Sequence, residues 1–147
     1  EQLAQSRRCD FKTIVVGRPR DLVPTVRDEV YQICREALIN AFQHAEATLI
    51  EVQLNYGLQI FAAHVRDDGM GIDPETLKAG KKAGHWGLIG MRERAREVGG
   101  YVEIWSGSRP GTEIQLQVPA RIAYVDSGAL RPSRWRRWLT AGARSSE

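Results

Sequence analysis

A long helical repeat of apolar residues, with polar side chains set into it, is the feature that most constrains this chain. The apolar residues recur at steps of three and four, as Val26, Val30, Ile33, Cys34, Ala37, Leu38, Ala41 and Ala45. This spacing predicts a helix from about Val26 to Ala45, and Pro24 suits its first turn. Glu36 and Asn40 lie four residues apart on one face of this helix, and His44 continues their line. Because an ionised Glu is costly in a core, we expect that line to open into a cleft.

The segments around this helix carry strand and helix patterns in turn. Strands are predicted at residues 11–16, 48–54, 59–65, 101–105 and 112–118, and a second helix at 87–98. Asn55–Gly57 suits a hairpin turn, Gly99 and Gly100 close the second helix, and Asp73 with Pro74 suits the start of a short helix. This order predicts one mixed, mainly antiparallel sheet covered on one face by helices, which is a two-layer α/β sandwich.

Size and charge narrow the classes of protein that the chain can represent. Its 147 residues suit one domain, and no apolar stretch approaches the roughly 18 residues that span a bilayer. Residues 127–147 hold five Arg and one acid, a charge of +4, so the net charge of +3 leaves −1 for residues 1–126. A nucleic-acid-binding domain is therefore not expected. Cys9 and Cys34 do not have the spacing of metal ligands. Cys34 lies in the apolar repeat and is predicted to be a reduced thiol in the core.

The Glu36 and Asn40 pair has the chemistry of a metal and phosphate site. An Asn side-chain oxygen is a hard ligand suited to Mg²⁺, which takes few protein ligands when phosphates supply the rest. A Glu one turn away could orient a water or accept a proton from a nucleophile. Taken alone, the pair is more often a solvated helix face.

A second polar segment ends the strand predicted at 59–65. Asp67 can accept a hydrogen bond from an exocyclic amino group such as that of adenine. Gly69 and Gly71 let the backbone approach a flat ring closely, whereas strand alternation points Asp68 elsewhere. An ordinary acidic turn is the more common explanation of such a segment taken alone.

Two glycine-containing segments complete the polar features. The stretch from Gly84 to Arg94 runs from a glycine-rich loop into a helix, where free amides and the helix dipole favour phosphates. A flexible loop before an ordinary helix explains this stretch equally well. Lys78, Lys81 and Lys82 precede it and could screen phosphate charge. Gly111 and Thr112 open the last strand, and alone they indicate only a hairpin.

These four segments, in this order, resemble the ATP-binding catalytic domain of sensor histidine kinases. That domain has the Bergerat-type ATP-binding fold of the GHKL group, which also holds gyrase, a heat-shock chaperone and mismatch-repair ATPases. Residues 35–45 look like the N box, 67–71 like the G1 box, 87–95 like the G2 region of the nitrate-sensor and lipid-fluidity-sensor branch, and 111–112 like the final G box. The resemblance covers roughly residues 10–120, and four boxes in order are far more specific than any one.

The resemblance implies an ATP and Mg²⁺ site and assigns residues to it. Glu36 is implied as the catalytic acidic residue of the N box, and Asn40 as the Mg²⁺ ligand. Asp67 is implied as the acceptor of the adenine amine, with Gly69, Gly71 and Thr112 at the adenine end. The other implied ATP-binding residues are His44 beside the phosphates and the lid residues Lys82, Gly84, His85, Gly87 and Leu88.

Further expectations concern a longer parent protein. The chain starts at Glu1 rather than Met, so we expect residues 1–9 to be a remnant of a linker from dimerisation helices. Residues 10–120 are then the catalytic domain, and 121–147 a basic C-terminal tail. The resemblance implies a cytoplasmic location, a homodimeric parent that could be membrane-anchored, and two partners, its own phospho-acceptor domain and a response regulator. No His of this chain has the acceptor context, so the fragment alone is not expected to phosphorylate itself.

Two other functions stay open at the level of sequence. A stand-alone GHKL switch protein, such as an anti-sigma serine kinase, would have this length, although residues 90–94 favour the histidine-kinase branch. The other hypothesis is a degenerate module that binds a partner protein without a nucleotide. Gln43 departs from the family, which often has Lys or Arg there. Residues 131–138 mix Arg and Trp and could touch an acidic partner or a membrane surface.

Overall fold

The computed structural model describes residues 8–73, 75, 87–106 and 110–125. Its elements are strand β1 (Asp10–Gly17), helix α1 (Pro24–Ile39), the π-helical turn η1 (Asn40–His44), strands β2 (Leu49–Tyr56) and β3 (Ile60–Asp67), helix α3 (Leu88–Glu97), strands β4 (Tyr101–Ser106) and β5 (Thr112–Pro119), and the short helix α4 (Ala120–Ala123). All five predicted strands and both long helices are present. The short helix expected after Asp73 falls mostly outside the described residues.

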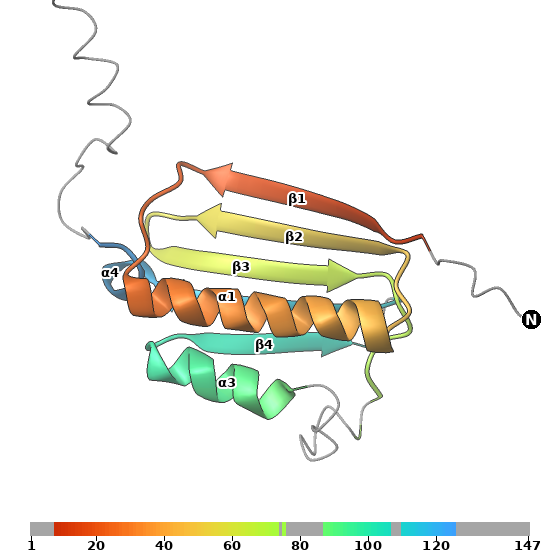
Figure 1. The fold of residues 1–147 in the computed structure, drawn as a ribbon. Coiled ribbons are helices and arrows are strands. Elements are labelled where there is room, and N and C mark those ends of the chain that lie inside the picture. The colour runs from red at the N-terminus through yellow and green to blue at the C-terminus, as the bar shows by residue number, and fades with distance from the viewer. Residues whose placement is uncertain (1–7, 74, 76–86, 107–109, 126–147) are drawn as a thin grey trace, which may run out of the picture.

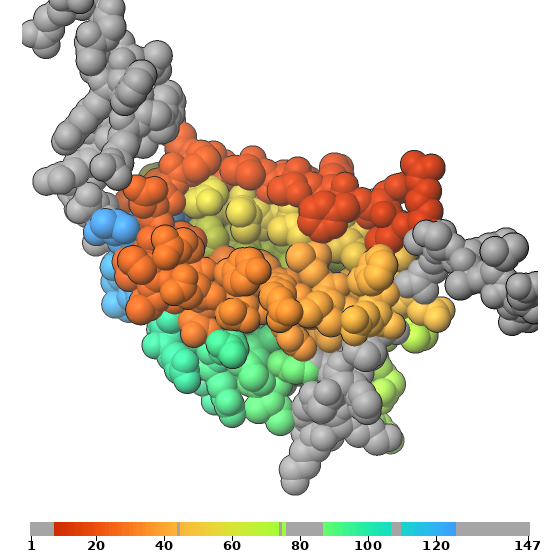
Figure 2. All heavy atoms as spheres, in the orientation of Figure 1, coloured from red at the N-terminus to blue at the C-terminus, as the bar shows by residue number. Residues whose placement is uncertain are grey.

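The strands form one mixed sheet in the order β1-β2-β3-β5-β4. β1 pairs with β2 in parallel, and the other three pairings are antiparallel. Figure 1 shows α1 and α3 on one face of this sheet. The predicted two-layer α/β sandwich is therefore confirmed. Figure 2 shows that the helices do not cover the whole face, because β1 and part of β2 remain visible along the upper edge.

The core lies between the sheet and these two helices. Alternate residues of β3 and β5 point at the helices and are buried, namely Phe61, Ala63, Val65, Ile114, Leu116 and Val118. They meet the apolar stripes of α1 (Val26, Val30, Ile33, Ala37) and α3 (Leu88, Met91, Ala95). Each large apolar side chain buried here contributes about 1.5–3 kcal/mol. None of the helices in the described part of the chain is both long and apolar enough to cross a membrane.

The end of the long helix differs from the α-helix that its apolar repeat predicts. The α-helical part stops at Ile39, and the chain continues for one wider turn. The Ala45 N–H donates to the Asn40 carbonyl oxygen across 3.0 Å, an i-to-i+5 bond typical of a π-turn. With this turn, the Asn40 side chain is only 3% exposed, whereas Phe42 is 56% exposed.

The packed fold continues beyond residue 120, where the sequence analysis places the start of the tail. Ala120 and Ala123 of α4 are buried, and Tyr124 is only 2% exposed. The Tyr124 hydroxyl donates to the Gly57 carbonyl oxygen across 2.8 Å, and the Arg20 guanidinium lies 3.9 Å from the Tyr124 ring centroid. Residues 120–125 therefore belong to the folded domain.

Candidate functional site

Four segments that are distant in sequence meet at one end of the sandwich. At this end α1 runs into η1, β3 ends at Asp67, α3 begins after Gly87 and β5 begins at Thr112 (Figure 1). These are the segments whose polar residues the sequence analysis singled out. The fold therefore brings the Asn40 and Asp67 segments to the same end of the molecule.

Asp67 and Thr112 form a buried polar pair between two strands. They stand opposite each other in the β3–β5 register and are 8% and 6% exposed. Asp67 Oδ1 accepts a hydrogen bond from the Gly69 N–H across 2.8 Å. Burial raises the pKa of Asp67, and hydrogen bonds from the backbone N–H groups of Gly69 and Thr112 oppose that rise. Among the described residues, the buried Thr112 Oγ1 has no hydrogen-bond partner, so the pair suits a ligand with polar edges.

Asp68, next to this pair, binds the protein instead of facing a ligand. Its Oδ1 accepts hydrogen bonds from the backbone N–H groups of Thr48 (2.8 Å) and Leu49 (2.9 Å), and its Oδ2 accepts one from Thr48 Oγ1 (2.6 Å). These bonds lower the pKa of Asp68, and the bond from the Thr48 hydroxyl has the largest effect. Asp68 thus ties the end of β3 to the start of β2, which agrees with the expectation that it points away from Asp67.

The loop after Asp67 packs against the end of η1. The Met70 N–H donates to the Ala45 carbonyl oxygen across 2.9 Å, and a Cβ on Gly69 would lie only 2.2 Å from that oxygen. Gly69 is therefore required by this contact between protein segments. Gly71 lies further along the loop, where the next residue, Ile72, donates its N–H to Ser106 Oγ across 2.8 Å. Sequence reasoning missed Ser106, which anchors the loop to the end of β4.

Glu36 and Asn40 lie where α1 passes the start of α3. Asn40 opens η1, and Glu36 is half-buried one turn earlier. A Cβ on Gly87 would lie 2.6 Å from Glu36 Oε1, so the carboxylate rests on the backbone from which α3 begins. The predicted metal and phosphate residues are thus placed beside the beginning of the predicted lid helix.

The remaining predicted site residues divide into described and undescribed groups. Leu88, predicted in the lid, has its side chain fully buried in the core, so only its backbone could face a ligand. His44 ends η1, but its side chain lies outside what the structure describes. Lys82, Gly84 and His85 also lie outside the described residues.

Comparisons with known proteins show what this chain is similar to. A family profile described as histidine kinase-, DNA gyrase B-, and HSP90-like ATPase matches residues 25–122. The sensor histidine kinases LiaS and YdfH of Bacillus subtilis (strain 168) are 36% and 38% identical, each over 94 residues, which are 64% and 63% of this chain. These matches span only 25% and 22% of the two relatives. The histidine kinase domain of the Erythrobacter litoralis EL346 blue-light activated kinase has a TM-score of 0.58 and 24% identity, covering 74% of this chain and 54% of that one.

Proposed function

The chain belongs to the histidine kinase-, DNA gyrase B- and HSP90-like ATPase family, and we propose that it is the ATP-binding catalytic domain of a sensor histidine kinase. The observation that carries this proposal is the placement of a buried Asp67–Thr112 pair and the Glu36–Asn40 pair at one end of the same sandwich. One ATP can then run between them, with its adenine at Asp67 and its phosphates at Asn40.

At the adenine end, Asp67 accepts the exocyclic amine and Thr112 supplies a further polar group. A buried carboxylate is a strong selector for a hydrogen-bond donor, because leaving either partner unpaired costs free energy. Gly69 and Gly71 shape the adjoining backbone. Guanine presents a carbonyl oxygen in place of the amine, so the site disfavours it.

At the phosphate end, Asn40 is the protein ligand for Mg²⁺. Within the described residues, no group of three or more His, Cys, Asp and Glu side chains is placed to hold a metal. The proposed ion is held by the Asn40 amide oxygen, the phosphates and water, because Mg²⁺ keeps several waters and needs few protein ligands when phosphates supply the rest. When bound, it neutralises charge on the phosphates. The proposed phosphate and lid contacts are His44, Lys82, Gly84, His85, Gly87 and the backbone of Leu88.

The proposed reaction transfers the ATP γ-phosphoryl group to a histidine on a separate acceptor domain. Such catalysis consists mainly of positioning and electrostatic stabilisation. Glu36 is proposed to act as the base that accepts the proton of the attacking group or orients it. Its contact with Gly87 then joins the catalytic carboxylate to the start of α3.

An apolar groove along β1 and the end of α1 is proposed to receive part of the acceptor domain. The groove, of about 350 Å³, lies between β1 and the end of α1 and is lined by Phe11, Leu38, Ile39, Phe42, Gln43 and Ile50. Phe11 and Phe42 are 58% and 56% exposed. A helix that carries the acceptor histidine could pack its apolar face there while the histidine reaches the γ-phosphate.

The domain bounds and the longer parent protein are proposed by analogy with the sensor histidine kinases to which this chain is similar. Residues 10–120, extended to 125 by the packing of Tyr124, form the catalytic domain, and residues 1–9 continue from a linker. The parent is proposed to be a homodimer with its ATP site in the cytoplasm, and to pass the phosphoryl group to a response regulator. We do not expect the domain to bind nucleic acid.

The test combines binding and phosphorylation. Calorimetry is expected to show one ATP·Mg²⁺ per chain, and radiolabelled γ-phosphoryl ATP is expected to leave the isolated chain unlabelled. Adding the acceptor domain of the parent protein should produce acid-labile label on that domain. Absence of ATP binding would favour the degenerate interaction module, and stoichiometric phosphohistidine on the isolated chain would contradict the need for a separate acceptor.

A further inference from the structure

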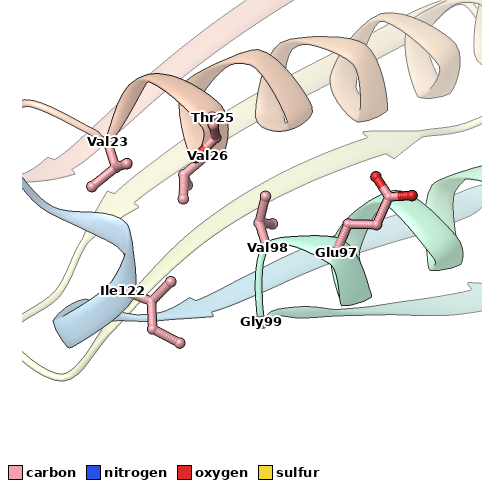
Figure 3. Close-up of a pocket in the computed structure, with 7 residues that line it drawn as sticks. All are labelled: Val23, Thr25, Val26, Glu97, Val98, Gly99 and Ile122. Carbon is pink, nitrogen blue, oxygen red and sulfur yellow. The ribbon is translucent and has the colours of Figure 1, made fainter.

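A second pocket lies at the other end of α1, away from Asn40. Its volume is about 420 Å³, and it is lined by Val23, Thr25, Val26, Glu97, Val98, Gly99 and Ile122. Figure 3 shows these residues coming from the start of α1, the end of α3 and α4. Pockets that bind organic groups commonly fall between about 300 and 1,000 Å³, so this one can hold bulky side chains.

The walls of this pocket are fixed by the ends of helices. The N–H groups of Gly99 and Gly100 donate to the carbonyl oxygens of Arg96 and Ala95 across 3.0 and 2.8 Å, which closes α3. A Cβ on Gly99 would come within 2.8 Å of Ile122 Cδ1, so α3 and α4 are in close contact here. Val23, Val98 and Ile122 are only half-buried, which leaves apolar surface available to an occupant.

The described chain leaves the domain beside this pocket. The Val125 N–H donates to the Asp21 carbonyl oxygen across 3.0 Å, two residues before the pocket residue Val23. Val125 is also only three residues beyond Ile122. The ten residues from Val125 to Trp135 can span up to about 33 Å, so the following segment reaches the pocket easily.

The following segment has the side chains that this pocket fits. Trp135, Trp138 and Leu139 recur at i, i+3 and i+4, the spacing of one apolar helical face. Arg134 and Arg137 flank them in sequence. Aromatic side chains bury about 150–250 Å² each, which suits a pocket with three half-buried aliphatic walls.

Charge at the rim complements these arginines. Glu97 is among the residues that line the pocket, comes from the last turn of α3 (Figure 3), and is exposed. Glu97 is also the last residue of α3, where the helix dipole favours positive charge. Arg94 of the same turn is already paired with Glu29 across 3.1 Å, so it does not compete directly for Glu97.

We propose that residues 131–139 fold back onto the domain and fill this pocket. Trp135, Trp138 and Leu139 occupy the apolar interior, and the neighbouring arginines lie beside Glu97. The segment then straps the start of α1 to the end of α3. These two helices carry Asn40 and Gly87 at their opposite ends, so the strap holds the helices of the nucleotide site together from the far side.

The experiment uses tryptophan fluorescence of the full chain. With Trp86 and Trp105 replaced by Phe, only Trp135 and Trp138 report. Their emission is expected to be blue-shifted and poorly quenched by acrylamide compared with a peptide of residues 126–147. Thr25→Phe, which fills the mouth of the pocket from an exposed position, should abolish both effects. Gln32→Phe, at an exposed position of α1 outside the pocket, should leave them unchanged.

A second measurement tests the strap by substitutions in the tail. Trp135→Ala with Trp138→Ala is expected to lower the Tm of the full chain by about 5 °C, as loss of a buried aromatic would. The same pair in a chain that carries Thr25→Phe should cause little change. The proposal is overturned if Trp135 and Trp138 of the full chain emit like the free peptide in the absence of lipid. It is also overturned if their blue shift persists in the Thr25→Phe variant, or if the blue shift appears only when anionic vesicles are added. The last outcome would make the segment a membrane-binding one. None of these results depends on whether ATP binds.

Discussion

The carboxylate of Glu36 rests against the backbone of Gly87, so closely that a Cβ on Gly87 would lie 2.6 Å from Glu36 Oε1. Gly87 also has φ of +62°, a conformation that favours glycine. One contact therefore joins the proposed base to the residue from which α3 begins. Any change at Gly87 should be felt both in the stability of the domain and at the phosphate end of the site.

Gly87→Ala is expected to lower the free energy of unfolding by about 1–3 kcal/mol, because it combines a left-handed φ with a clash. Urea denaturation would measure this. Gly90→Ala is the matched control, since a Cβ on Gly90 meets nothing within 4 Å, and it should stabilise α3 by about 0.5–1 kcal/mol. Adding Glu36→Ala to Gly87→Ala should recover part of the loss, and a purely additive double mutant would show that the contact is unimportant.

Asp67 and Asp68 are adjacent carboxylates with separable roles. Asp67→Asn should weaken ATP·Mg²⁺ binding by about 10- to 150-fold, the effect of losing a charged hydrogen bond of about 1.5–3 kcal/mol. Asp68→Asn should leave the affinity nearly unchanged, while lowering stability through the lost bonds to Thr48 and Leu49. Calorimetry and urea denaturation of both variants check the pair. Equal losses of ATP affinity in the two variants would contradict the assignment.

Much of this site could be predicted from the chain itself. Asp67 continues the alternation of Phe61, Ala63 and Val65, so its inward direction follows from the strand period. The burial of Leu88 could also have been predicted, because Leu88 recurs with Met91 and Ala95 on one face of α3. The family resemblance instead assigns Leu88 to the ATP lid.

Other features depend on contacts that no local pattern encodes. The π-turn at Asn40 is defined by the i-to-i+5 hydrogen bond from the Ala45 N–H to the Asn40 carbonyl oxygen. The apolar pattern of residues 26–45 does not predict this turn, because it also fits a regular α-helix. The Glu36–Gly87 contact and the Ser106 bond to Ile72 join segments distant in sequence. The parallel partner of β1 likewise depends on how α1 crosses the sheet.

The two aspartates should also give stability opposite dependences on pH. Burial raises the pKa of Asp67 above its ordinary value of 3.8, so the folded state holds this proton more tightly than the unfolded chain. Stability should therefore fall as pH rises from 3.8 through the folded pKa of Asp67. The Thr48 and Leu49 bonds lower the pKa of Asp68, so its contribution is present above 3.8 and is lost as pH falls through its folded pKa.

Urea midpoints measured on both sides of pH 3.8 separate these contributions. Asp67→Asn should flatten the profile above 3.8, and Asp68→Asn should flatten it below. Unchanged profiles in both variants would show that neither carboxylate is linked to folding in the way its surroundings indicate.

The Cys34 thiol should react slowly in the folded chain. Burial raises the pKa of the Cys34 thiol to about 11, so at pH 8 only about one molecule in a thousand carries the reactive thiolate. A maleimide or a disulfide reagent should therefore modify Cys34 slowly in the folded chain and rapidly in urea. The Cys9→Ser variant isolates this reaction, and rapid labelling of folded Cys9→Ser would mean that α1 opens readily.

The groove between β1 and the end of α1 gives the sharpest test of the proposed acceptor contact. Phe42→Asp places a charge in this groove at a side chain that is already 56% exposed, so the domain should stay folded. Calorimetry should show ATP·Mg²⁺ affinity within about threefold of wild type, a change of less than 1 kcal/mol. Phosphorylation of the separate acceptor domain should instead fall by at least about tenfold, because a desolvated carboxylate opposes apolar docking. Leu58→Asp, at a side chain that is 91% exposed in the β2–β3 turn, is the matched control and should affect neither measurement. If Phe42→Asp and Leu58→Asp phosphorylate the acceptor domain equally well, the acceptor approaches the γ-phosphate over a different surface.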